Sequence, residues 1–143
     1  MKSNILVFMQ FFIIFLMILP FGTHSTTFMY GLGISLVGGV IGFFALRSNQ
    51  LGNFNIRPDI KEECTLVTSG IYAYIRHPMY SAVLVAMLGV VVMYPSVYEY
   101  TLYGALVITL LIKLSYEERL WKCESEEYRR YTESTKRLIP FVY

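Results

Sequence analysis

The chain has 143 residues, of which 55% are hydrophobic and 15% are charged, and its mean hydropathy is +0.51. A soluble domain carries about 25% charged residues, so this composition excludes an ordinary soluble protein and predicts an integral membrane protein. The net charge of +2 is too small to indicate a nucleic-acid partner, which leaves the lipid bilayer as the expected partner.

The first third of the chain is apolar and long enough for two membrane spans. No Asp, Glu, Lys or Arg occurs in residues 3–46, a length about twice the roughly 20 residues that one spanning helix needs. We expect spans at about 5–22 and 28–46, separated by a polar turn after Pro20. A cleaved signal peptide is the alternative for the first span, although no clear cleavage site of small residues follows it.

Small residues recur along the second predicted span at spacings of three and four. This spacing places them on one face of a helix, where they allow another helix to approach closely. We therefore expect close helix packing, with a ligand-binding turn at residues 31–33 as the alternative. The small residues are Gly31, Ser35, Gly38, Gly39 and Gly42.

A polar loop and a second pair of spans follow. Residues 47–78 are rich in polar and charged side chains and contain no apolar segment long enough for a span, so they predict a loop outside the membrane. Apolar segments at about 79–94 and 97–115 predict two further spans, which the short turn at Pro95 joins as an antiparallel hairpin.

The tail, residues 116–143, is strongly charged and predicts a segment outside the membrane. We expect one helix over 117–137 that lies against the loop or the membrane surface. The chain then ends in a short stretch that Pro140 keeps from being helical.

All 12 Lys and Arg residues fall on one side of this arrangement. They lie at Lys2, in the loop 47–78, and from Lys113 onward. The positive-inside rule therefore places the loop and both the N- and C-termini in the cytoplasm. The sequence predicts an all-α, multi-pass integral membrane protein with four transmembrane helices, a cytoplasmic loop and a C-terminal cytoplasmic helix, in a single domain over 1–143.

Two charged stretches meet predicted spans on that cytoplasmic side. The stretch LVTSGIYAYIRHPMY brings Arg76 and His77 to the start of the third span, and YEERL brings Glu117 and Glu118 to the end of the fourth. Because both stretches lie at the same membrane boundary, they could form one site. The alternatives are an arginine that reaches lipid phosphates and a solvated glutamate pair on a surface helix.

These stretches resemble a known family. The run TLVTSGIYAYIRHPMYS, followed after a hairpin of spans by YEERL, EEYRRY and RLIP, is similar to the isoprenylcysteine carboxyl methyltransferases and to the wider group of membrane methyltransferases that includes the phospholipid N-methyltransferases. The resemblance covers residues 57–143, and the first two spans carry no such signature. It implies an enzyme that uses S-adenosylmethionine in a cytoplasmic-side pocket and takes a lipophilic substrate from the bilayer.

The resemblance also implies which residues contact the cofactor. The segment after the glutamate pair is one residue shorter than is usual in the family, so Glu118 stays an alternative to Glu117. Tyrosines of this region could equally form an interfacial aromatic belt, the role that we expect for Tyr74. The implied cofactor contacts are Thr65, Leu66, Val67, Tyr72, His77, Pro78, Met79, Tyr80, Glu117 and Glu118.

Arg76, Lys113 and Glu117 are the candidate catalytic residues. Lys113 precedes Glu117 by four residues, so the two share a helix face. In the family an Arg stands at this offset and is assigned to the substrate; Lys offers a point charge in place of a bidentate grip, which leaves the acceptor open. A carboxylate acceptor needs a cation such as Lys113 or Arg76, whereas an amine must be deprotonated, with Glu117 or Glu118 as the base.

The expected function is therefore methyl transfer to a lipophilic acceptor, of the isoprenylcysteine carboxyl O-methyltransferase type. The alternatives are a phospholipid or amine N-methyltransferase and a non-enzymatic membrane subunit. Four spans make a small membrane domain, so a homodimer is plausible. The two cysteines, Cys64 and Cys123, predict neither a disulfide nor a metal site.

Overall fold

The computed structural model describes residues 2–19, 25–49 and 66–140, and these are mostly helical. In this part of the chain the only strand-like pairing is an isolated parallel bridge between Ile75 and Lys136. The predicted all-α class is confirmed for these residues. The helices are α1 (Lys2–Ile18), α2 (Phe28–Ser48), α3 (Pro78–Met93), α4 (Val97–Glu124) and α5 (Glu126–Ser134), with a 3-10 turn, η1 (Gly70–Ala73).

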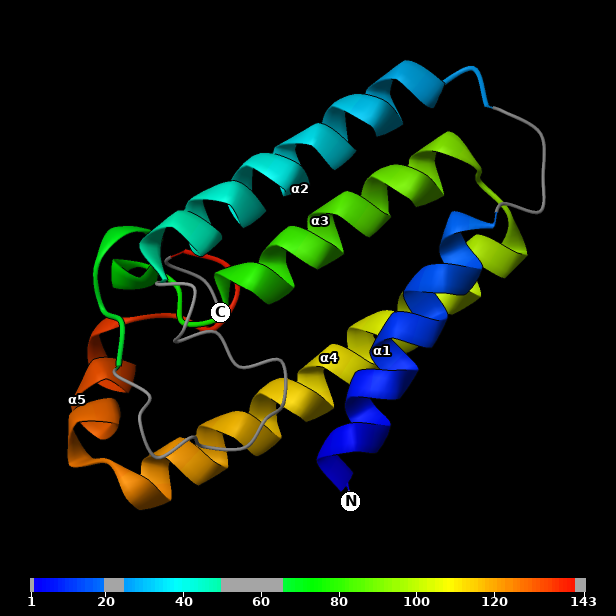
Figure 1. The fold of residues 1–143 in the computed structure, drawn as a ribbon. Coiled ribbons are helices and arrows are strands. Elements are labelled where there is room, and N and C mark those ends of the chain that lie inside the picture. Colours follow the sequence, from blue (N-terminus) through cyan, green and yellow to red (C-terminus); the bar gives the residue numbers. More distant parts are fainter. Residues whose placement is uncertain (1, 20–24, 50–65, 141–143) are drawn as a thin grey trace.

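The long helices form two antiparallel pairs. Figure 1 shows α2 beside α3 and α1 beside α4, and contacts of α3 with both α1 and α4 join the pairs. The end of α2, the start of α3, η1 and α5 lie at the same end of the molecule (Figure 1). The two charged stretches of the sequence are therefore close together in space.

Glycines set the distance between α2 and α3. A Cβ atom on Gly31 would lie 2.6 Å from the Gly89 carbonyl oxygen, and one on Gly38 would lie 2.5 Å from the Ala86 nitrogen, so neither position has room for a side chain. The hydroxyl of Ser35 donates to the Ala86 carbonyl at 2.9 Å. The predicted close packing is confirmed at these three positions of α2.

Two of the predicted small residues contribute less to that interface. A Cβ on Gly42 would make only an ordinary contact, 3.5 Å from the Ala82 Cβ, and a Cβ on Gly39 would meet nothing within 4 Å. The prediction is therefore wrong for Gly39, because a helix turns about 100° per residue and Gly38 already faces α3. Residues 31–33 are helical within α2 and do not form the alternative turn.

The core lies where α1, α3 and α4 converge. It contains Ile13 and Met17 from α1, Val91 from α3, and Leu106 and Leu110 from α4. The outward faces of the helices are apolar as well, with many large exposed hydrophobic side chains. A helix that is apolar all round suits a lipid environment.

Two of the described helices are long and apolar enough to cross a membrane, α2 and the range Val97–Cys123 of α4. The 17 residues of α1 and the 16 of α3 extend only about 25 Å at 1.5 Å per residue, short of the roughly 30 Å hydrocarbon core. Two spans are thus supported by length, and the count of four stays a prediction. The predicted end of the first span, 20–22, lies outside the described residues.

Helix α4 extends beyond the fourth predicted span, which was expected to end at about residue 115. α4 continues without a break from Val97 to Glu124, and α5 begins only at Glu126. The expected single helix over 117–137 is wrong in this respect. No Gly or Pro interrupts residues 113–125, so the helix continues until the Ser125 side chain accepts a hydrogen bond from the Tyr128 backbone N–H, at 3.2 Å, and caps α5.

Candidate active site

A tight turn delivers the first charged stretch to the start of α3. Gly70 has φ +62°, and a Cβ there would clash with the side chain of Ser48 in α2, so the position requires glycine. After η1 the chain extends through Arg76 and His77, and Pro78 opens α3 in its first turn, where proline's fixed φ suits a helix. Arg76 and His77 therefore lie immediately before a rigid helix.

The C-terminal segment, residues 135–140, holds this stretch in place. Its backbone runs parallel to 74–77 and is joined to it by three hydrogen bonds. The hydroxyl of Ser81, in the first turn of α3, donates to the Leu138 carbonyl at 2.6 Å. The bonds are Arg76 N–H to the Lys136 carbonyl (2.8 Å), His77 N–H to the Arg137 carbonyl (3.0 Å) and Lys136 N–H to the Tyr74 carbonyl (3.2 Å).

Aromatic side chains of α5 complete this arrangement. Tyr128 and Tyr131 are both buried, and Tyr128 stacks on Trp121 of α4 with ring centroids 5.6 Å apart. The Tyr131 hydroxyl donates to the Tyr72 carbonyl in η1, and burial raises the pKa of Tyr131 to about 12. α5 therefore ties the end of α4 to the segment that leads into α3.

A buried ion pair links the two charged stretches. Arg76 Nε donates to Glu118 Oε1 at 2.8 Å, and the two side chains are only 7% and 3% exposed. The Arg76 guanidinium also donates to the backbone carbonyl and the hydroxyl of Thr135, and Arg137 Nε donates to the second oxygen of Glu118 at 3.1 Å. The buried charges of Arg76 and Glu118 are tolerated in the interior because they are paired with each other and hydrogen-bonded.

Glu117, the residue before Glu118 in α4, has a separate set of partners. The Tyr80 hydroxyl donates to Glu117 Oε1 at 2.6 Å, and His77 Nδ1 lies 3.6 Å from Glu117 Oε2. The rings of His77 and Tyr80 stack with centroids 5.4 Å apart, which confirms that they share a face. His77 Nε2 is 3.4 Å from Glu118 but is buried without a hydrogen-bond partner in the described residues.

The two glutamates have opposite electrostatic environments. Both lie in the charged continuation of α4, beyond the predicted span that ends at 115. Burial raises the pKa of Glu117, against the opposing effects of His77, Tyr80 and Lys113. Burial also acts to raise the pKa of Glu118, but His77 and Arg76 outweigh it and lower that pKa to about 2. Neighbouring acids with pKa values driven apart can serve as a proton acceptor and a fixed anion.

Lys113 brings α1 into the site. Its side chain is 2% exposed, its ammonium donates to Gln10 Oε1 at 2.9 Å, and it lies 5.1 Å from the centre of the Tyr80 ring, within cation–π range. The sequence analysis missed Gln10. Its signal was an amide within the apolar residues 5–18, since polar groups in membrane helices are commonly functional.

The structure brings together six of the predicted site residues. They are Arg76, His77, Tyr80, Lys113, Glu117 and Glu118.

The other predicted contacts lie around this group or beyond the described residues. Pro78 is fully buried and Met79 half-buried in the first turn of α3, and Leu66 and Val67 are half-buried before η1. The remaining two are Tyr72, in η1 against α5, and Thr65, which lies outside the described residues. Tyr74, for which we expected a place in an interfacial aromatic belt, is 59% exposed.

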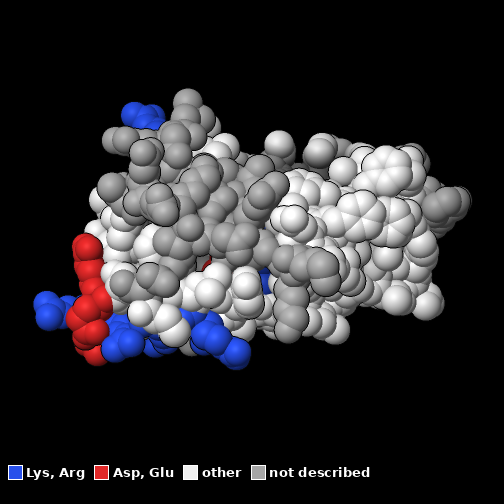
Figure 2. Space-filling model, turned by 60° about the horizontal axis from the view of Figure 1, so that its bottom comes forward, with Lys and Arg blue, Asp and Glu red and all other residues white. Residues whose placement is uncertain are grey.

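Charged side chains are concentrated at the end of the molecule that carries this site. Figure 2 shows most of the described Lys, Arg, Asp and Glu side chains on this face gathered at the end that carries α5, and mostly uncharged described residues toward the opposite end. Among the described residues, no group of three His, Cys, Asp or Glu side chains is placed to hold a metal ion. The site therefore combines a polar end with an apolar helical body.

Comparison with known proteins identifies the family. The sequence profile of the phospholipid methyltransferases matches residues 26–123, well over half of the chain. The matched region includes α2, η1, α3 and nearly all of α4, and it leaves out Gln10 and the C-terminal segment. A comparison with curated proteins gives no match. The resemblance to the wider group of membrane methyltransferases is confirmed: the chain belongs to the phospholipid methyltransferase family.

Proposed function

We propose that the protein transfers a methyl group from S-adenosylmethionine to a lipophilic amine at the membrane. The observation that carries this proposal is the buried contact of Tyr80 and His77 with Glu117, at the polar end of an apolar helix bundle. Membership of the phospholipid methyltransferase family supports methyl transfer, and the helical architecture supports an acceptor that arrives from lipid.

The residues present suit the cofactor. S-adenosylmethionine offers an ammonium and a ribose diol, which need an acceptor, and an adenine, which needs aromatic or apolar surface. Glu117 supplies carboxylate oxygens, the stacked rings of His77 and Tyr80 supply aromatic surface, and His77 Nε2 is a buried nitrogen without a hydrogen-bond partner in the described residues. These three side chains would hold the cofactor.

The protein's contribution to the chemistry would be alignment and exclusion of water. When bound, the cofactor would supply an electrophilic methyl group, and transfer of that methyl group to the acceptor would need little acid catalysis from the protein. Glu117 and His77 are 14% and 11% exposed, so the site is largely shielded from solvent. Orienting the reactants in a dry site lowers the barrier without any covalent intermediate.

The engaged cations favour an amine acceptor over the expected carboxylate. Arg76 already binds Glu118 and Thr135, and Lys113 already binds Gln10, so each cation has a protein acceptor. Glu117 has a pKa raised by burial, which makes it a better base than Glu118. An amine must lose its proton before it attacks, and we assign Glu117 as the base that takes that proton.

Calorimetry on the purified protein tests cofactor binding directly. Wild-type protein should bind S-adenosylmethionine, and Glu117→Gln should bind it at least about tenfold more weakly, the size expected for a hydrogen bond to a charged group. Glu127→Gln, at an exposed position of α5, is the matched control and should bind normally. Wild-type protein that shows no binding would overturn the proposal and favour a non-enzymatic subunit.

A further inference from the structure

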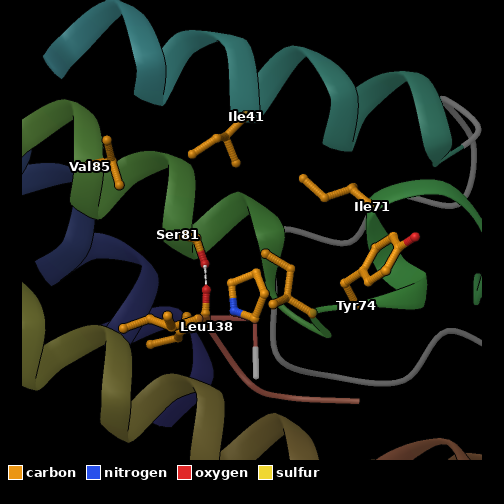
Figure 3. A pocket seen from close by; sticks show the side chains of 9 residues that line it. Ile41, Ile71, Tyr74, Ser81, Val85 and Leu138 are labelled. Atoms are coloured by element: carbon orange, nitrogen blue, oxygen red, sulfur yellow. Dashed lines mark hydrogen bonds between the residues drawn. The ribbon is translucent and has the colours of Figure 1, made fainter. Parts of the chain in front are cut away.

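An apolar pocket of about 430 Å³ lies between α2, η1, α3 and the C-terminal segment. Figure 3 shows Ile41 of α2 facing Val85 and Ser81 of α3, with Ile71 and Leu138 closing other sides. Small-molecule sites in proteins typically have volumes of roughly 300–1,000 Å³. The pocket is therefore large enough for a ligand.

The lining of the pocket suits a hydrocarbon. Its walls carry no charged side chain among the described residues, and the hydroxyl of Ser81 is already bonded to the Leu138 carbonyl. The hydroxyl of Tyr74 points away from Ser81 and Leu138 in Figure 3. A charged headgroup inside would lose its hydrogen bonds to water without replacement, so the lining favours a hydrocarbon chain over a headgroup.

The pocket and the polar site share one short segment of chain. Ile75 and Ser81 line the pocket, whereas Arg76, His77 and Tyr80, between them in sequence, contact the glutamates of α4. A single amphiphile could therefore place its chain on one side of this segment and its head on the other.

The surface beside the pocket is apolar as well. On α2, Val37 is 55% exposed and Phe44 is 50% exposed. Lipid against this face could deliver a hydrocarbon chain to the pocket without exposing the chain to water.

We propose that this pocket binds the acyl chain of the lipophilic acceptor. That the bound lipid is the methyl acceptor rests on the proposed function. That the pocket binds an acyl chain is independent of the proposed function. For a single-chain amphiphile that binds from aqueous solution, each buried CH₂ contributes about 0.8 kcal/mol, or about fourfold in affinity, so a longer chain should bind more tightly.

Photolabelling of the purified full-length protein tests this binding. The probe is a palmitoyl lysophosphatidylethanolamine with a diazirine in its chain, and labelled peptides are identified by mass spectrometry. Labelling should saturate, should map to peptides containing Ile41 or Val85, and should be displaced by unlabelled palmitoyl lysophosphatidylethanolamine at least tenfold more effectively than by the hexanoyl form. Labelling that never saturates and spreads over the outer helix faces would overturn the proposal.

Neighbouring substitutions on α2 provide the control. Ile41→Trp fills the pocket and should reduce saturable labelling at least tenfold, whereas Val40→Trp, on the exposed face, should leave it unchanged. Val85→Phe repeats the test from α3 if Ile41→Trp fails to fold. Equal effects of the two tryptophans would contradict the pocket.

Calorimetry with S-adenosylmethionine on the same samples separates this inference from the proposed function. Normal cofactor binding without saturable labelling overturns the pocket alone. Loss of cofactor binding in Ile41→Trp with labelling retained would assign the pocket to the cofactor, and so also overturns it. Saturable labelling in a protein that binds no cofactor supports the chain site and overturns the methyltransferase proposal.

Discussion

Arg76 joins three parts of the chain through one buried guanidinium. It lies two residues before α3, pairs with Glu118 of α4, and donates to Thr135 after α5. The sequence predicted a catalytic role for this arginine, and the contacts support a positioning role, since they fix the segment that carries His77 and Tyr80. Removal of the Arg76 side chain would leave the buried Glu118 carboxylate with Arg137 as its remaining arginine partner.

We expect Arg76→Met to lower the free energy of unfolding by about 3 kcal/mol or more, the usual cost of breaking a buried ion pair. Thermal or denaturant unfolding in detergent micelles measures the loss. Arg129→Met is the control, because its pair with Glu126 is more than half exposed on both sides, and it should cost less than about 1 kcal/mol. Equal losses in the two variants would contradict the assigned role of Arg76.

Single residues were predictable where a motif and the charge distribution agreed. His77, Tyr80, Glu117 and Glu118 were placed in one site because two charged stretches share one predicted membrane face. Gln10 was not predicted to belong to the site. Its contact with Lys113 depends on how α1 is rotated against α4, and a uniformly apolar helix gives no pattern from which that rotation can be predicted. The contact of Thr135 with Arg76 depends on the return of the C-terminal segment, a tertiary feature without a local signal.

Helix α4 carries the site because it extends beyond its apolar part. Lys113 and Glu117 lie one turn apart on the same helix, so the buried lysine and the candidate base keep a fixed separation. The packing of α2 on α3 then fixes the start of α3 opposite them. The separation of α2 and α3 is set by glycines that tolerate no side chain.

Substitutions at adjacent glycines of α2 test this packing. Gly38→Leu should lower the free energy of unfolding by about 1–3 kcal/mol or more, because the new side chain meets the α3 backbone. Gly39→Leu, where nothing lies within 4 Å, shares the same change in helix propensity and should be neutral or stabilising. Thermal unfolding in micelles compares them, and similar melting temperatures would contradict the described interface.

The starts of helices were easier to predict than some of their ends. Apolar segments and prolines placed the starts of α2, α3 and α4 within one residue of those observed. Hydropathy marks where a span ends and gives no information on whether the helix continues, so the end of α4 was predicted too early. The Ser125 cap was the local signal that could have corrected it.

At the scale of the whole molecule, the exposed charges of the described residues on the face in view gather at one end. Figure 2 shows the charged side chains at the end near α5, and all 12 basic residues of the sequence belong to segments predicted on one side. We propose that this end is cytoplasmic, with both termini on that side and four helices in the membrane.

Labelling with a membrane-impermeant maleimide tests the proposed topology. In a Cys64→Ser background, the exposed Cys123 should react in inverted vesicles and not in intact cells. In a background that also lacks Cys123, Ser3→Cys should behave like Cys123, whereas Val97→Cys, whose native side chain is 81% exposed at the start of α4, should react in intact cells. Reaction of Ser3→Cys on the same side as Val97→Cys would contradict the four-span arrangement.

The central claim is methyl transfer to lipid at the Glu117 site. The most direct measurement reconstitutes the purified protein in phosphatidylethanolamine vesicles, adds S-adenosylmethionine with a radiolabelled methyl group, and counts label in the extracted lipid. Wild-type protein and Glu127→Gln should label the lipid, and Glu117→Gln should be slower by at least about 10², as expected for loss of a general base. Wild-type protein that labels no lipid, or Glu117→Gln protein that is fully active, would contradict the claim.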